Sequence, residues 1–300
     1  MAFLGSPEPA AVALDALVGA GHDVKLVVTR PDKRRGRGGA VSATPVKETA
    51  ARHGLTVTSD PAAVTAAGAE LGVVVAYGRI IRPDILAALP MVNVHFSLLP
   101  RWRGAAPVER AILAGDRTTG VCLMDVEEGL DTGAVYRRAE TAIGPDDTAA
   151  GLTARLAGMG AELLVRALDE GLGQPVPQAG EVTYAAKIEP EDLHLDWARP
   201  AVELHRVVRI GRAWTTWQGR RLLVLAAHPV EAGDPGAGGG ATDRAGSATD
   251  GDGTDSASRA SAGGRRPGTI DGATVATGQG GLRLELVQPE GRRPMPAADW

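Results

Sequence analysis

Short apolar runs alternate with segments of helical spacing through the first half of the chain. An apolar run at residues 1–4 is followed by apolar positions at helical spacing up to Val18, and a second apolar run occupies residues 24–28. Ser6 and Pro7, between the first run and the helical segment, are typical of a helix start. A strand, a helix and a strand at this spacing predict a parallel βαβ unit.

The same alternation continues to residue 170. The run at 71–78 is apolar throughout, which is typical of a central parallel strand that is covered on both faces. The pattern therefore predicts a parallel α/β sheet. The predicted helices are 45–53, a small one that begins at residue 61, 83–89, 107–113 and 148–170, and the predicted strands are 55–58, 71–78, 91–96, 121–126 and 134–139.

The last third of the chain has a different pattern. A Pro- and Gly-rich stretch at 171–181 indicates a linker between two domains. Short strands with Gly turns beyond it favour a small β-barrel over another βαβ domain. Residues 231–268 are too poor in apolar residues to form a core, so we predict that they are disordered. The predicted elements are a helix at 201–210, two strands around residues 218 and 219, and strands near 269–277 and 282–288.

The length agrees with two domains, because 300 residues exceed one ordinary core. We assign residues 1–171 to the α/β domain, 172–189 to the linker and 190–300 to the second domain. With 44% hydrophobic and 23% charged residues, the composition is that of an ordinary globular protein. Aromatic residues make up only 3%, so the core must consist mainly of Val, Leu, Ile and Ala.

The sequence also bears on the compartment. No apolar run approaches the roughly 20 residues of a membrane helix, and the amino terminus does not have the pattern of a secretory signal. The single cysteine, Cys122, cannot form an internal disulfide, and a small buried hydrophobe is a better interpretation of it than a nucleophile. These features favour a cytoplasmic protein, and nothing in the sequence requires more than a monomer.

A net charge of −4 argues against a nucleic-acid coat over the whole surface, but one segment is basic. Residues 29–45, which we call the basic loop, are Gly-rich and too long for a simple connection. Several cations on a flexible backbone suit a polyanion such as RNA, and a solvated charged loop is an equally good interpretation. Neither a GxGxxG nor a Walker A motif occurs, so the glycines do not indicate a nucleotide site. The cations of the basic loop are Arg30, Lys33, Arg34, Arg35 and Arg37.

The predicted strand at 91–96 carries two polar residues, Asn93 and His95. Side chains two positions apart on a strand project from the same face, and parallel sheets bind ligands at the carboxyl ends of their strands. An amide and an imidazole there can donate hydrogen bonds to an oxygen that becomes negative during acyl transfer, and His95 can also move protons near neutral pH. The commoner alternative for such a histidine is a satisfied residue of the core.

Asp131 lies in the turn GLDTG, after a later strand of the same predicted sheet. A carboxylate at this place can orient the imidazole or take a proton from an attacking amine. The alternative is a turn aspartate that bonds its own backbone. No HExxH, CxxC or GxSxG motif occurs in the chain, so the sequence predicts neither a metal site nor a serine nucleophile.

The stretches NVHFSLLPRWRGAAP and GLDTG together resemble the folate-dependent formyltransferase superfamily. The resemblance covers nearly the whole chain, and SLLPRWRGAAP is its most specific part. Within the superfamily the chain is similar to the members that act on methionyl-tRNA. The resemblance implies a Rossmann-like parallel-sheet formyltransferase domain, followed by a small OB-like β-barrel that binds tRNA. Other matching segments are FLGSPEPA, the basic loop, SATPVKE, VVVAYG, VTYAAKI and VQPEGRRPMPAADW.

The resemblance also implies an activity and a set of site residues. The activity is transfer of the formyl group of 10-formyltetrahydrofolate to the α-amino group of methionyl-initiator tRNA, with no metal. The catalytic residues of the superfamily fall on Asn93, His95 and Asp131. Its folate-contacting segment falls on Ser97, Leu98, Leu99 and Pro100, and its tRNA-contacting residues fall on Arg35 and Arg37 of the basic loop.

The chain departs from the superfamily outside this site. The first strand is a few residues short, so we expect its pairing to be frayed. The segment before residue 73 is shortened, a proline is missing near Arg212, and residues 231–268 look like an insertion. These departures concern the docking of tRNA and leave the formyl-transfer residues untouched.

Three other functions stay open. The chain could formylate a small amine such as an amino nucleotide sugar, or it could hydrolyse formyltetrahydrofolate with water in place of the amine. It could also be an RNA-binding protein on a dead catalytic fold, although the intact set of Asn93, His95 and Asp131 argues against that.

Overall fold

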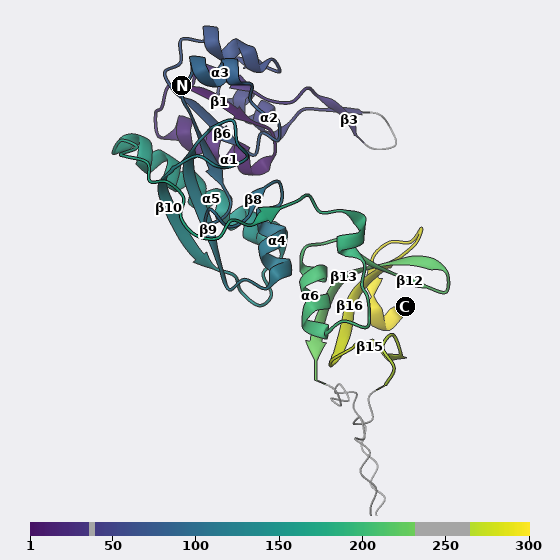
Figure 1. The fold of residues 1–300 in the computed structure, drawn as a ribbon. Coiled ribbons are helices and arrows are strands. Elements are labelled where there is room, and N and C mark those ends of the chain that lie inside the picture. Colours follow the sequence, from purple (N-terminus) through teal and green to yellow (C-terminus); the bar gives the residue numbers. More distant parts are fainter. Residues whose placement is uncertain (36–39, 232–264) are drawn as a thin grey trace, which may run out of the picture. The chain divides into compact units, whose positions relative to one another are not determined.

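The computed structural model describes residues 1–35, 40–231 and 265–300, which form two compact units, Met1–Glu189 and Pro190–Trp300 (Figure 1). The first unit contains a seven-stranded sheet with helices on both faces. Among its described residues, the second unit has an antiparallel sheet and one α-helix, α6 (Ala201–Arg209). In the described part of the chain, no helix is both long enough and apolar enough to cross a membrane.

The sheet of the first unit has the strand order β10-β9-β7-β6-β1-β2-β5. The five strands from β7 to β5 are parallel, whereas β9 runs antiparallel to β7 and β10 runs antiparallel to β9. The prediction of a wholly parallel sheet is therefore wrong at one edge, because an apolar run does not reveal the direction of a strand. The strands are β1 (Ala2–Gly5), β2 (Leu26–Val28), β5 (Val57–Thr58), β6 (Gly72–Val75), β7 (Met91–His95), β9 (Thr118–Asp125) and β10 (Val135–Ala142).

The first strand is not frayed. It pairs with β2 on one side and with β6 on the other, and all four of its residues are buried. A strand between two neighbours is held along both edges, so its short length does not weaken it as it would at the edge of a sheet. The expectation of frayed pairing is wrong.

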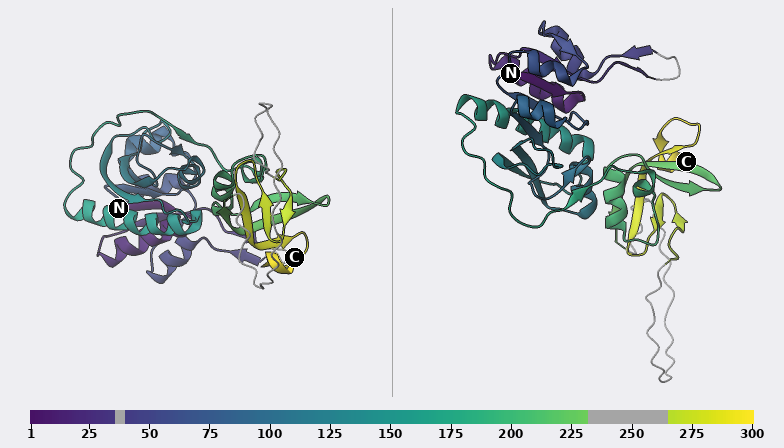
Figure 2. Two further views of the ribbon diagram at one scale, coloured as in Figure 1. Left: turned by 90° about the horizontal axis from the view of Figure 1, so that it is seen from below. Right: turned by 45° about the horizontal axis from the view of Figure 1, so that its top comes forward.

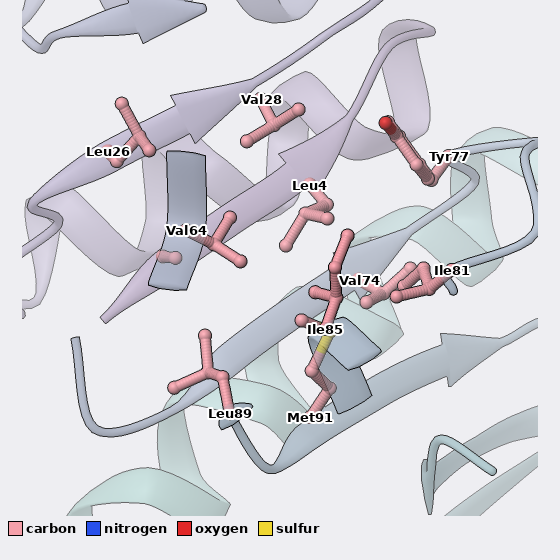
Figure 3. Close-up of a cluster of buried hydrophobic side chains, with 11 residues drawn as sticks. Leu4, Leu26, Val28, Val64, Val74, Tyr77, Ile81, Ile85, Leu89 and Met91 are labelled. Carbon is pink, nitrogen blue, oxygen red and sulfur yellow. The ribbon is translucent and has the colours of Figure 1, made fainter. Parts of the chain in front are cut away.

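Helices cover the two faces of this sheet differently. Helices α1 (Glu8–Gly19) and α5 (Ala149–Asp169) pack against each other along one face, as Figure 2 shows. The other face carries a cluster of buried side chains in which Leu4 and Met91 of the strands meet Ile85 (Figure 3). The remaining helices of this unit are α2 (Pro45–Arg52), the 3-10 helix η1 (Pro61–Ala66), α3 (Pro83–Ala88) and α4 (Pro107–Ala114).

The basic loop contains a short antiparallel hairpin, which the sequence analysis did not predict. Strand β3 (Lys33–Arg35) pairs with β4 (Ala40–Ser42). The run of charged residues in β3 has no apolar alternation, so no strand signal was visible in the sequence. Arg37 lies outside the described residues, and so does the side chain of Arg35.

Residues 172–189, which the sequence analysis assigns to a linker, lie against the first unit. Strand β11 (Tyr184–Ala185) pairs with β8 (Arg103–Gly104), and Val176 forms an isolated bridge with Val135. This segment therefore belongs to the first unit, Met1–Glu189. Its Pro and Gly content reflects an irregular path over a surface, and that path is fixed by hydrogen bonds.

The second unit has the strand order β12-β13-β16-β15-β14, with β17 paired to β16. In the described part of the chain no pairing joins β12 to β14, so the sheet is open, whereas a barrel requires its end strands to pair. Closure of the predicted barrel is therefore not seen. The elements are β12 (Ala213–Trp217), β13 (Arg220–Val230), β14 (Ile270–Asp271), β15 (Thr274–Ala276), β16 (Gly281–Pro289), β17 (Met295–Pro296) and the 3-10 helices η2 (Pro190–Leu193) and η3 (Ala297–Asp299).

The predicted disordered insertion, 231–268, falls mostly on residues 232–264, which lie outside the described residues. Residues 265–268, at the carboxyl end of the predicted insertion, are described and make contacts. Gly268 N donates a hydrogen bond to Ala276 O at 2.8 Å, and Arg265 forms an ion pair with Asp271. The second unit therefore resumes a few residues earlier than predicted.

Candidate active site

Strand β7 presents Asn93 and His95 on one face of the sheet. In the antiparallel ladder with β9, Asn93 lies opposite Met124 and His95 lies opposite Cys122. Val94, between them, faces the other side, where α5 approaches so closely that a Cβ added to Gly160 would lie 2.7 Å from Val94 Cγ1. The pleat thus aims the two polar side chains in one direction, while the apolar residue between them is locked against a helix.

The amide of Asn93 is open. Its side chain is partly exposed, and it makes no hydrogen bond with any residue that the structure describes. An amide in this condition has its two N–H donors available to a ligand.

His95 is held by a backbone carbonyl. Its side chain is 6% exposed, and Nε2 lies 2.9 Å from Trp102 O. Because a carbonyl oxygen only accepts hydrogen bonds, Nε2 carries a proton and donates it to Trp102. The other ring nitrogen, Nδ1, faces Asp131 Oδ2 at 3.7 Å. Nδ1 is therefore the atom of His95 that is free to gain or lose a proton.

An irregular turn brings the carboxylate of Asp131 to the His95 ring. Since β9 is antiparallel to β7, the turn begins beside the amino end of β7, where Asp125 pairs with Val92. Asp131 has a φ of 50°, and a left-handed backbone at a residue other than glycine costs about 1–3 kcal/mol and persists where the surroundings hold it. Here Gly104 N donates to Asp131 Oδ2 at 2.8 Å, so the carboxylate serves a contact 27 residues away along the chain.

The loop that follows β7 links these contacts. Trp102, whose carbonyl accepts from His95, also has a left-handed backbone, with a φ of 65°. Its indole Nε1 donates to Asp116 Oδ2 at 2.8 Å, its backbone N donates to Thr183 Oγ1 at 2.9 Å, and the guanidinium of Arg101 lies 4.4 Å from its ring centroid. The loop is thereby fixed from two sides, which keeps the Trp102 carbonyl aimed at His95.

The four residues expected at the folate are mostly internal. Ser97 is buried and its hydroxyl donates to Arg101 O at 2.5 Å, while Leu99 packs with Cys122 and Met124. Pro100 is also buried, and Leu98 is the partly exposed member of the four. Leu98 is therefore the side chain of this set that presents surface to a ligand, and the other three shape the loop.

Cys122 is chemically quiet. It is buried and free, and desolvation raises the pKa of its thiol. A thiol that resists ionisation is a poor nucleophile, which agrees with the interpretation of Cys122 as a packing residue.

The basic loop contributes one cation that is described in full. Arg30 Nη2 donates to Tyr77 O and to Gly78 O, each at 3.3 Å. This guanidinium is therefore engaged with the turn after β6. Arg37 and the side chain of Arg35 lie outside the described residues, so their role in binding tRNA stays a prediction.

Several groups that hold the site were not predicted from the sequence. The Trp102 carbonyl and the Gly104 amide lie inside the conspicuous stretch RWRG, but backbone atoms leave no signature in a sequence. Gln178 donates to Asp131 O and to Gly133 O, each at 2.8 Å, from a segment whose composition suggested only a linker. No signal in the sequence pointed to it.

The fold and this cluster define a class of protein, an α/β enzyme with an amide, an imidazole and a carboxylate at the end of a central strand. Residues 1–168 match the family model described as formyl transferase, and residues 187–300 match the model of the formyl transferase C-terminal domain. The chain belongs to the formyl transferase family.

Individual relatives agree with this family. A methionyl-tRNA formyltransferase of Symbiobacterium thermophilum is 43% identical, over 99% of this chain and 90% of the relative. One from Corynebacterium aurimucosum is 41% identical, over 99% of this chain and 92% of the relative. Among solved structures, HypX from Aquifex aeolicus in complex with tetrahydrofolic acid has a similar fold, with a TM-score of 0.64 and 16% identity over 99% of this chain and 46% of that chain.

Proposed function

We propose that this enzyme transfers the formyl group of 10-formyltetrahydrofolate to the α-amino group of methionyl-initiator tRNA. The observation that carries the proposal is the open amide of Asn93 beside the His95 and Asp131 pair, in a chain 43% identical to a methionyl-tRNA formyltransferase. We further propose that the enzyme acts as a monomer in the cytoplasm.

The chemistry follows from the available atoms. The neutral amine attacks the formyl carbon, a C–N bond forms, and the carbonyl oxygen becomes negative. The amide of Asn93 donates to that oxygen, and His95 contributes Nδ1–H when its ring is protonated, since Nε2–H is already given to Trp102. The C–N bond to the folate then breaks.

The protons balance in this scheme. The attacking amine loses one proton as it becomes an amide, and the departing folate nitrogen gains one. Asp131, close to His95 Nδ1, stabilises the protonated ring while the proton is in transit. We assign the catalytic roles to Asn93, His95 and Asp131 on this basis.

For the formyl donor, we propose that residues 97–100 form one wall of the binding site. Leu98 is the partly exposed side chain of this loop, and its Cδ2 would lie 2.6 Å from a Cβ added to Gly120 on β9, the strand that pairs with β7. The flat pteridine ring of a folate suits an apolar contact of this kind. Tetrahydrofolic acid is bound in the similar fold of the Aquifex aeolicus protein, which supports the choice of donor.

For the tRNA, we propose contacts from Arg35 and Arg37 of the basic loop and from the second unit, in the role first expected of an OB-like barrel. Exposed arginines lie at the start of β13 and just after β16, and these two places are joined by a hydrogen bond from Glu290 N to Arg221 O at 3.0 Å. Phosphate contacts of this kind weaken as salt rises. These arginines are Arg220, Arg221, Arg292 and Arg293.

One assay tests the proposed function. The protein is incubated with 10-formyltetrahydrofolate, with and without methionyl-initiator tRNA, and the release of tetrahydrofolate is followed. We expect release that requires the charged tRNA. Release without any amine would identify a hydrolase, release with an amino nucleotide sugar but not with tRNA would identify a small-amine formyltransferase, and no release would leave a binding protein.

A further inference from the structure

A short segment before the second unit braces the loop and the turn that hold His95 and Asp131. Thr183 O accepts from Arg103 N at 2.9 Å, and Ala185 O accepts from Ala105 N at 2.8 Å. A Cβ added to Gly104 would lie 2.8 Å from Ala185 O, so the close approach of the two backbones depends on this glycine, which has a φ of 122°. The two segments form a single backbone contact.

Gln178 joins this contact to the Asp131 turn with both ends of its amide. Its Nε2 donates to Asp131 O and to Gly133 O, each at 2.8 Å. Its Oε1 accepts from Arg103 Nε at 3.1 Å and from Arg103 Nη2 at 2.6 Å. The amide therefore holds the carbonyl of the strained residue Asp131 on one side and the loop between Trp102 and Gly104 on the other.

The loop held by Gln178 supplies the two backbone groups that orient the proposed catalytic pair. Trp102 O accepts from His95 Nε2, and Gly104 N donates to Asp131 Oδ2. Arg103 lies between these two residues and is the one that Gln178 binds. A shift of Arg103 relative to the turn therefore moves the partner of His95 and the partner of Asp131 together.

We propose that Gln178 is a positioning residue for formyl transfer, which acts by fixing the Asp131 turn against the loop at residues 102–104. The proposal rests on the proposed function, because it gives Gln178 a role only through His95 and Asp131. In this proposal the segment 172–189, which was predicted to be a linker, controls the positions of His95 and Asp131. A misplacement of about 1 Å in such a site costs on the order of a hundredfold in rate.

The first test compares two amide substitutions. Gln178→Ala removes all four hydrogen bonds, and Gln178→Glu keeps an acceptor for Arg103 but loses the donors to Asp131 O and Gly133 O. We expect both variants to lower kcat by about 10- to 100-fold, with KM for the folate and for the tRNA within about twofold of the original values. A wild-type kcat in Gln178→Ala would overturn the proposal.

Arg110→Ala is the matched control. Arg110 binds the same segment through Ala186 O at 3.0 Å and Lys187 O at 2.8 Å, but it makes no described contact with the Asp131 turn. We expect its kcat to stay near the original value at a comparable loss of thermal stability. An equal loss of kcat in Arg110→Ala would show that general loosening of the segment is responsible, and this too would overturn the proposal.

A measurement without turnover separates this proposal from the proposed function. The exchange rate of the Gly104 amide proton with solvent, measured by NMR, reports its bond to Asp131. We expect faster exchange in Gln178→Ala and an unchanged rate in Arg110→Ala, and an unchanged rate in both would refute the positioning role. If the parent protein shows no formyl transfer while this exchange behaves as expected, the proposed function fails and the structural coupling stands.

Discussion

The two pieces of chain that meet at the site are held in place by different means. Asn93 and His95 sit on a central strand whose neighbours pair with it on both edges. Asp131 sits in a turn with a left-handed backbone, and it is held by Gly104 and Gln178 from distant parts of the sequence. The strand imposes its geometry by regular pairing, whereas the turn receives its geometry from a few individual hydrogen bonds.

On the strand, different residues provide the packing and the proposed chemistry, whereas in the turn one residue provides both. On the strand, the residues proposed for the chemistry, Asn93 and His95, alternate with the buried apolar residues Val92 and Val94, which pack the strand into the core. In the turn, the carboxylate of Asp131 has both tasks, since it faces His95 and also accepts from Gly104. Substitutions should therefore have separable effects on the strand and combined effects in the turn.

The largest effect is expected for Asp131→Ala. Loss of the carboxylate removes the partner of His95 and leaves the Gly104 amide without its acceptor, so kcat should fall by about 10³-fold or more. Steady-state formylation of methionyl-tRNA measures it. Asp131→Asn keeps an acceptor for Gly104 but loses the charge, and turnover close to that of the parent in Asp131→Asn would remove the charge from the mechanism.

A smaller loss is expected for Asn93→Ala. One donor to the developing oxyanion is lost, which corresponds to about 10²–10³-fold in kcat. Because the Asn93 amide makes no hydrogen bond with any described residue, the midpoint of urea unfolding should not change. Turnover near that of the parent protein would contradict the oxyanion role, and a large drop in stability would contradict the separation of tasks on the strand.

The packing of β7 can be tested without touching the chemistry. A Cβ on Gly160 would lie 2.7 Å from Val94 Cγ1, so Gly160→Ala should destabilise the first unit by about 1–3 kcal/mol. The control is Gly158→Ala on the same helix, where no atom lies within 4 Å of the added Cβ. It should stabilise by about 0.5–1 kcal/mol, since alanine favours a helix interior. Urea unfolding of both variants gives the comparison, and equal effects would contradict the close contact.

The smallest effect concerns the base of the turn at high pH. Tyr136 Oη donates to Asp125 Oδ1 at 2.6 Å, and burial, together with this neighbouring carboxylate, raises the pKa of Tyr136 to about 12. The neutral phenol is favoured in the folded state, and an unfolded tyrosine titrates near about 10.

The sign of the pH effect follows from this difference. The stabilisation is present in full below about pH 10 and is lost as pH rises through the pKa of the folded state. The difference in unfolding midpoint between the parent protein and Tyr136→Phe should therefore shrink from about pH 9 to about pH 12. A difference that stays constant over this range would contradict the raised pKa.

Regular elements were largely predictable from the chain. The predicted strand at 91–96 is observed as Met91–His95, and the predicted helix at 148–170 is observed as Ala149–Asp169. The periodicity of apolar positions reports local structure directly, because burial of one face and the pleat of a strand repeat at fixed intervals. Strand direction is not encoded this way, which is why the antiparallel β9 and β10 were predicted to be parallel.

The sequence by itself determined which residues could carry the chemistry: Asn93, His95 and Asp131 are singled out by their residue types, by the strand pattern and by a resemblance that the family matches confirm at the level of the family. Only the tertiary structure decided how they meet. The Asp131 turn, the proton on His95 Nε2 and the brace at Gln178 depend on backbone atoms of Trp102, Gly104 and Gly133. Every residue has a backbone C=O and every residue except proline has a backbone N–H, so a bond from a side chain to a distant backbone group leaves no trace in the identity of the residue that supplies that group.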